Sequence, residues 1–211
     1  MTTREIYNFY LENIAPIYLS KTKIVRRDLV EMAYEEIILA RDWVFAINTT
    51  TITSDSNGDI ELPDDFQNLS AVEEGRDSPV WIKGDRVNTY PIIIIPKHNL
   101  QRFDFQTGGV EGYYYIDDLT NTLKFYNGYA RPNAEFNITY KMKPERLQDD
   151  SEPKLIPSQF HKILAYRTAL VSFMRNGVQE ETQTSRAEIQ RIYNNLYMEL
   201  EKFDNERWRG M

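Results

Sequence analysis

The chain has 211 residues, with 32 acidic and 25 basic side chains and a formal net charge of −7. A groove that grips nucleic acid by neutralising phosphates needs a local excess of basic residues, so this composition argues against such a protein. The absence of cysteine excludes disulfides, thiolate metal sites and cysteine nucleophiles.

Membrane insertion is also not expected. The longest purely apolar run, Ile92 to Ile95, is far too short to span a bilayer. The N-terminal residues have charges and polar groups throughout, which is unlike a signal peptide. We therefore expect a soluble, cytosolic chain.

Two helical patterns open the sequence. The first is a short apolar stripe from Ile6 to Ile14, interrupted at Pro16. The second repeats apolar residues at helical spacing from Val25 to Val44 and predicts a helix closed by Trp43.

Strand patterns replace the helical ones from about residue 46 to residue 142. Asn57-Gly58 between two β-prone runs predicts a hairpin, and residues 112–128 predict a second one. Between them, one or two helical turns are expected after Pro96. A further strand within 134–144 places its apolar side chains on one face, namely Phe136, Ile138, Tyr140 and Met142.

An acidic linker, residues 144–153, begins and ends with a proline and then leads to a strongly apolar helix. Pro157 suits its first turn and Gly177 its end. The apolar face covers well over half of the helix, which predicts packing on more than one side. Its members are Phe160, Ile163, Leu164, Leu170, Val171, Phe173 and Met174.

The last helix is expected to begin between Glu180 and Ser185, where Ser185 and Glu188 fit a capping box. A single apolar stripe follows, made of Ile189, Ile192, Tyr193, Leu196, Leu200 and Phe203. The closing residues are polar apart from Trp208.

These patterns predict an α+β fold in which a β-rich subdomain is inserted into a helical bundle. The expected bundle is discontinuous, with residues 1–45 and 154–206, and the inserted subdomain covers residues 46–143. Residues 144–153 are the linker and residues 207–211 a C-terminal tail. The chain leaves the helices, builds the insert and returns.

Enzymatic signals are weak. Each of the two histidines, His98 and His161, is better explained as a hydrogen-bonded or solvated side chain than as a metal ligand. Residues 54–59 and 62–66 place carboxylates in turns, and residues 107–112 lack the lysine and the helix of a phosphate-binding loop. We expect neither catalysis nor a metal or cofactor.

Several segments together resemble the head-to-tail connector, or adaptor, proteins of tailed bacteriophages, especially short-tailed ones. They are the N-terminal helix pair, DIELPDDFQNLSAVEEG at 59–75, YYYIDDLTNTLKFYNG at 113–128, and the stretch from Phe136 to Gly177. The matching motifs are the turn at 62–66, the strand at 138–144 and Ile156 to His161. Their order and spacing carry the resemblance, and residues 76–112 are the least recognisable part.

The resemblance implies a structural protein of the virion neck. Such adaptors assemble as a ring, expected to be a dodecamer, beneath the portal at one capsid vertex. The ring extends the channel through which DNA passes and receives the next ring or tail protein. A net-acidic chain suits a channel that does not hold DNA back.

The resemblance also implies that the C-terminal segment docks onto the portal, and Arg207, Trp208 and Arg209 have the chemistry of such an anchor. The alternative is a terminus whose tryptophan packs on its own helices. Two other readings of the chain remain open at this point. One is another neck or tail protein, such as a second-tier ring, tail-tube or tail-completion protein. The other is an enzyme or a cation-dependent binding module whose site is assembled from scattered acids.

Overall fold

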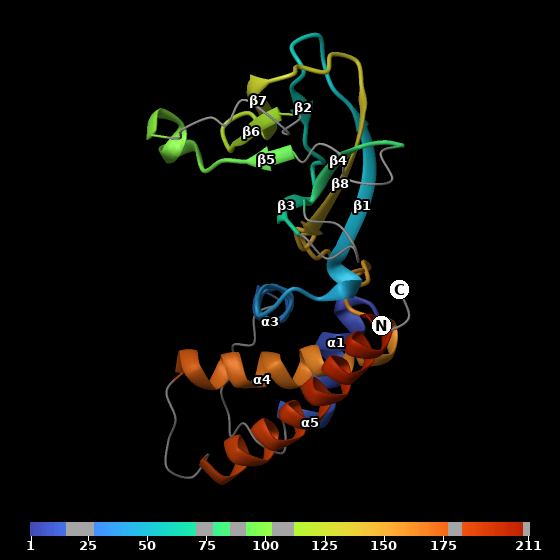
Figure 1. Ribbon diagram of the computed structural model, residues 1–211. Coiled ribbons are helices and arrows are strands. Elements are labelled where there is room, and N and C mark those ends of the chain that lie inside the picture. Colours follow the sequence, from blue (N-terminus) through green and yellow to red (C-terminus); the bar gives the residue numbers. More distant parts are fainter. Residues whose placement is uncertain (16–27, 71–77, 85–91, 103–111, 177–182, 209–211) are drawn as a thin grey trace. The chain divides into compact units, whose positions relative to one another are not determined.

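The computed structural model describes residues 1–15, 28–70, 78–84, 92–102, 112–176 and 183–208. Helices lie at both ends of the chain and strands in the middle, which confirms the α+β class (Figure 1). The contacts divide the chain into two compact units. The helical unit comprises Met1–Ala46 and Pro144–Met211, and the β unit comprises Ile47–Lys143.

The helical unit contains four α-helices and three short helices of other types in its described part. The α-helices are α1 (Thr3–Phe9), α3 (Asp28–Leu39), α4 (Lys162–Asn176) and α5 (Gln183–Trp208). A π-helical turn, η1 (Tyr10–Ile14), continues α1, and the 3-10 helices η2 (Val44–Ala46) and η4 (Ser158–Phe160) precede β1 and α4. None of the described helices is both long and apolar enough to cross a membrane.

Helix α4 forms the centre of this unit, as its broad apolar face predicts. It packs against α1, η1, α3 and α5. Ile163, Leu164, Ala165 and Ala169 are fully buried. Met174, at its far end, is the exception and is 54% exposed. Packing on several sides is therefore achieved within a single chain.

The second helix is shorter than the sequence predicts. It ends at Leu39, and Trp43 lies beyond it with its indole N–H donating to the Ile37 carbonyl at 2.7 Å. That bond, together with burial of the whole Trp43 side chain, turns the chain away from the helix axis. Ser185 lies inside α5, and the Glu188 carboxylate binds Arg191, so the predicted capping box is wrong. Pro16, Val25 and Gly177 lie outside the described residues.

Two four-stranded sheets form the described part of the β unit. In sheet A, β8 (Glu135–Met142) pairs with β1 (Ile47–Thr53) on one side and with β3 (Phe66–Leu69) and β4 (Val80–Ile82) on the other. Sheet B has the order β2 (Ile60–Glu61), β7 (Thr122–Gly128), β6 (Gly112–Asp117) and β5 (Ile92–Ile94). β5 and β6 run parallel, and the other pairs in both sheets are antiparallel.

The two predicted hairpins have different outcomes. Strands β6 and β7 form the second one as expected. The turn at Asn57-Gly58 exists, with Gly58 at φ +87°, but its flanking strands do not pair with each other. β1 joins sheet A and β2 joins sheet B, so the hairpin prediction is wrong and the turn passes the chain from one sheet to the other.

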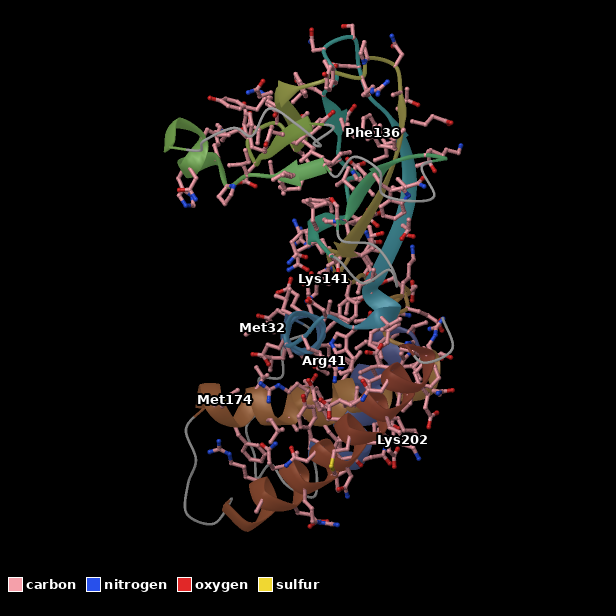
Figure 2. The ribbon with its side chains drawn as sticks, in the orientation of Figure 1. Met32, Arg41, Phe136, Lys141, Met174 and Lys202 are labelled. Carbon is pink, nitrogen blue, oxygen red and sulfur yellow. The ribbon has the colours of Figure 1, made fainter. Side chains whose placement is uncertain are left out.

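The core of the β unit lies between strands of both sheets. Phe136, Ile138 and Tyr140 on β8 are buried on one face, as their spacing predicts, and Phe136 is labelled in Figure 2. The rest of this core is Ile60, Leu62, Val80, Ile92, Tyr114 and Leu123. The helical turns expected after Pro96 are present as the 3-10 helix η3 (Lys97–Arg102).

Candidate docking segment at the C-terminal end of α5

The last two turns of α5 bind Val44 and Phe45, which lie shortly before the chain passes from the helical unit into the β unit. Asp204 is 1% exposed, and its Oδ1 accepts the N–H of Val44 at 2.8 Å and that of Phe45 at 3.4 Å. Burial raises the pKa of the Asp204 carboxyl, while the two N–H donors and the nearby cations oppose that shift. The Arg41 guanidinium is 3.7 Å from Oδ2.

Aromatic side chains surround this anchor. The Trp43 ring stacks on Phe45 at 5.1 Å between centroids and meets Tyr197 of α5 edge-on at 5.5 Å. Arg41 lies over the Trp43 ring at 4.8 Å, within the range of a cation–π contact. The C-terminal half of α5 is thus fixed to residues 41–45.

The structure places part of the predicted docking segment. Arg207 is exposed, and its guanidinium lies 5.8 Å from the centre of the Phe203 ring. A cation in the last turn also interacts favourably with the helix dipole. Helix α5 includes Arg207 and Trp208, which the sequence analysis assigned to the tail. The Trp208 side chain and Arg209 lie outside the described residues.

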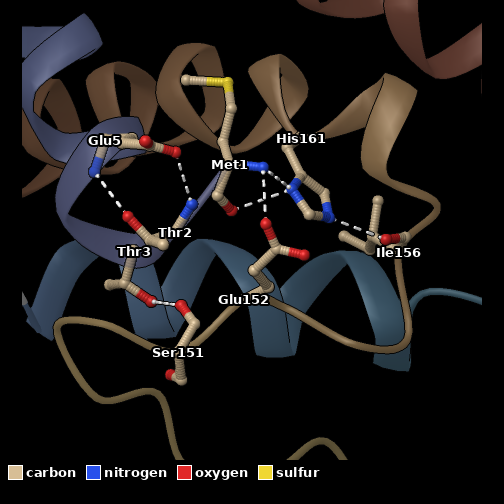
Figure 3. A network of polar contacts seen from close by, with 8 residues as sticks. All are labelled: Met1, Thr2, Thr3, Glu5, Ser151, Glu152, Ile156 and His161. Carbon is tan, nitrogen blue, oxygen red and sulfur yellow. Dashed lines mark hydrogen bonds and ion pairs between the residues drawn. The ribbon is translucent and has the colours of Figure 1, made fainter.

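Neither histidine belongs to a catalytic arrangement. His161 is buried and has polar neighbours at both ring nitrogens (Figure 3). Nδ1 lies 2.9 Å from both the amino nitrogen and the carbonyl oxygen of Met1, and Nε2 lies 2.9 Å from the Ile156 carbonyl. Glu152 also reaches the Met1 amino group, at 3.3 Å. His98 is exposed on η3, so both side chains match the structural explanation.

The acidic turns are structural as well. The Asp55 carboxylate accepts the N–H groups of Asn57 and Asp59 at 2.8 and 2.9 Å, which uses it as a turn acceptor. Asp65 accepts the Tyr140 hydroxyl at 2.9 Å. No group of three metal-binding side chains is found among the described residues. Most of the loop at 107–112 lies outside them.

Comparison with known proteins assigns the family. A family model described as SU10 adaptor protein matches residues 18–210, nearly the whole chain. The chain belongs to the SU10 adaptor protein family. None of the curated proteins compared with it matches. Family membership makes it a bacteriophage structural protein of the virion neck that acts in tail assembly as a head–tail adaptor and associates with other neck proteins.

Sequence reasoning missed two carboxylates of the adaptor's helical unit that bind residues next to its boundaries with the β unit in the chain. Asp204, described above, binds Val44 and Phe45 shortly before β1. On the return, Glu145 accepts the Tyr34 hydroxyl at 2.7 Å and the Lys154 N–H at 2.6 Å. The Tyr34 hydroxyl in turn accepts the Leu155 N–H at 3.1 Å. Burial, followed by the Glu145 hydrogen bond, raises the pKa of Tyr34. Except for Glu145 and Lys154, these partners are far apart in sequence, so no local pattern signals them.

Proposed function

We propose that this adaptor forms a closed ring, expected to be a dodecamer, beneath the portal, and that it carries the DNA channel towards the tail. In this proposal the chain is not an enzyme, DNA passes through the channel without sequence-specific binding, and the phage is short-tailed. The observation that carries the proposal is the family match over residues 18–210. A net charge of −7 supports a channel wall that does not retain DNA.

Exposed apolar side chains support contacts between neighbouring copies. In the helical unit they are Leu11, Leu39, Met174 and Met198, each between 38% and 57% exposed. Single exposed apolar residues are common on any protein, so their presence alone decides nothing. These residues lie on η1, α3, α4 and α5. They are the first residues to substitute in an assay of ring assembly.

The proposed portal anchor is Arg207, Trp208 and Arg209 at the end of α5. Tryptophan and arginine supply much of the binding energy in protein interfaces. Arg207 is exposed, and the fixed C-terminal half of α5 holds the segment on a rigid element. A rigid support lowers the entropy lost when the segment docks.

Sedimentation velocity with portal rings of the same phage tests the proposal. We expect a saturable mass increase of one adaptor chain per portal subunit. Removal of Glu206 to Met211 should weaken this binding by at least about tenfold, because a lost hot spot removes about 2 kcal/mol or more. Trp208→Ala should act in the same direction.

Lys202→Ala is the matched control, since Lys202 is exposed on the same helix (Figure 2). It should leave portal binding unchanged. If the intact chain gives no mass increase at high concentration, the portal is not its partner, and the search moves to the tail proteins. If truncation has no more effect than Lys202→Ala, the anchor lies elsewhere.

A further inference from the structure

One sheet edge in the β unit differs from the others described. β1 is seven residues long, pairs with β8 without a register shift, and contains neither proline nor a charged residue. The other edge strands, β2, β3, β4 and β5, have two to four residues. Proteins normally protect long edge strands with charges, prolines or bulges, because free backbone groups there invite another strand.

The register shows which backbone groups of β1 point outward. Thr139 lies opposite Thr49, yet its carbonyl accepts the Ser70 N–H and its own N–H donates to the Pro79 carbonyl. Thr49 and Thr139 therefore form a non-hydrogen-bonded pair. Because such pairs alternate along an antiparallel ladder, the N–H and C=O groups of Thr49, Thr51 and Thr53 point away from β8.

None of the described residues is hydrogen-bonded to these six outward groups. Other long strands differ in this respect. β7 extends beyond β2, but its Phe125 N–H donates to the Asp59 carboxylate at 2.8 Å and it carries Lys124. β8 is paired on both sides. The outer edge of β1 is therefore the longest unprotected edge in the described part of the chain.

The side chains of β1 fit an added strand. Thr49, Thr51 and Thr53 are exposed on one face, and Ile52 packs against the core of the β unit on the other. Threonine and isoleucine favour the extended conformation, so little ordering of the acceptor strand is needed. Although the chain as a whole is acidic, β1 itself has no charged side chain that would repel a neutral or acidic partner.

We propose that the outer edge of β1 accepts, by strand addition, an extended segment of the neck protein that lies next to this adaptor on the tail side. The segment spans about five residues, pairs with Thr49, Thr51 and Thr53, and has no proline at the positions that donate to them. The choice of the tail-side neighbour rests on the proposed function, which assigns the portal contact to α5 in the other unit.

A second copy of the chain fits this edge less well. Among the described edge strands, only β1 itself is long enough to match five residues of β1 in a neighbouring copy. That pairing is isologous and closes at a dimer, whereas a ring needs two different surfaces in contact. If each β1 instead pairs with a strand from a different protein, every copy of β1 in the ring has the same surroundings.

Residue-resolved amide hydrogen exchange tests the edge directly. In the free chain, the amides of Thr49, Thr51 and Thr53 should exchange fast, while those of Thr50 and Ile52 should be protected. Adding the purified tail-side neck protein of the same phage should slow exchange at the three threonines by about tenfold or more. Adding portal rings should not.

Variants at Thr51 separate the backbone from the side chain. Thr51→Pro removes an outward backbone donor while keeping the backbone hydrogen bonds to β8, and it should abolish binding of the tail-side protein. It also removes the side-chain bond from Thr51 Oγ1 to Asn137 Oδ1 of β8 at 2.7 Å, which the Thr51→Val control loses as well. Thr51→Val keeps the donor and should retain binding. Thr51→Lys keeps the backbone intact and should weaken binding by placing a charge on the edge. Protected amides at Thr50 and Ile52 establish that each variant is folded.

Each contrary outcome overturns the proposal. The three amides could already be protected in the free chain, stay unprotected with the tail-side protein, or become protected only with portal rings or by self-association. Portal sedimentation of Thr51→Pro tests the proposed function separately. The intact chain could fail to bind portal rings while the tail-side protein still protects the β1 amides. That result would contradict the proposed portal contact and leave the strand addition standing.

Discussion

Asp204 connects two distant parts of the chain through one buried carboxylate. Its Oδ1 takes the N–H groups of Val44 and Phe45, which begin the 3-10 turn before β1. Ionisation of a buried acid is unfavourable, and the raised pKa of Asp204 reflects this. The two N–H donors and Arg41 compensate part of that penalty.

Asp204→Ala should therefore destabilise the helical unit. It leaves two backbone N–H groups without an acceptor, which costs about 1–3 kcal/mol of unfolding free energy. Urea denaturation measures the change. Glu199→Ala, at an exposed position of the same helix, should stay within about 0.5 kcal/mol of the unmodified chain. Equal effects of the two substitutions would show that the Asp204 contacts are not stabilising.

Asp117 gives a prediction for acid stability. Hydrogen bonds from Lys97 and Lys124, at 2.8 and 2.9 Å, hold the pKa of its carboxyl well below the ordinary value. A carboxylate with a lowered pKa in the folded state stabilises the protein above the pKa of the unfolded chain, about 4. That contribution is lost as pH falls below about 4.

Thermal melts of Asp117→Asn and the unmodified chain check this. We expect the unmodified chain to melt higher at neutral pH and the difference to shrink as the solution is acidified below about pH 4. A difference that stays constant across this range would mean that the lysine pairs do not set the pKa of Asp117.

At the scale of elements, α4 is the helix on which the helical unit depends. Leu164 is fully buried, whereas Met174 is half exposed on the same helix. Leu164→Ala should lower the free energy of unfolding by about 2–5 kcal/mol through lost burial and a cavity. Met174→Ala should change it by about 0.5 kcal/mol or less. Chemical denaturation of both variants measures these changes. Similar losses of unfolding free energy would contradict the prediction that the buried face of α4 determines the stability of the helical unit.

Local sequence patterns predicted the type of each secondary-structure element more accurately than they predicted which elements pair with each other. Asn57-Gly58 predicted a turn, and the Asp55 carboxylate and the positive φ of Gly58 provide it. The turn does not decide pairing, because β1 finds its partner in β8, almost ninety residues later. Likewise, apolar spacing continued the second helix to Val44, but bonds from Trp43 to Ile37 and from Val44 to Asp204 end it at Leu39.

At the scale of the whole molecule, each unit has its own core. Leu164 belongs to the helical unit and Ile138 to the β unit, and both are fully buried. Leu164→Ala should therefore speed amide exchange mainly in peptides from α1, α4 and α5. Ile138→Ala should do so mainly in peptides from β1, β6 and β8. Mass spectrometry of exchanged peptides measures both, and a uniform response throughout the chain would mean that the units unfold as one.

The candidate docking segment was less predictable than the fold. Trp208 between two arginines is visible in the sequence as interface chemistry, but its support is not. Asp204 and Arg41 hold α5 to residues 41–45 through contacts that span about 160 positions. The unprotected edge of β1 was equally hidden, because an edge is defined by the strands that do not pair with it.

The register of β1 and β8 has a consequence for how such chains diversify. Ile47 lies opposite Lys141, so the chain enters and leaves the β unit at neighbouring positions about 5 Å apart. For the helical unit, closing this gap is entropically similar to closing a short loop, whatever the length of the insert. Genetic exchange that replaced residues 47–143 as a block would therefore leave the chain path of the helical unit unchanged, and under the proposed strand addition it would change the tail-side partner alone.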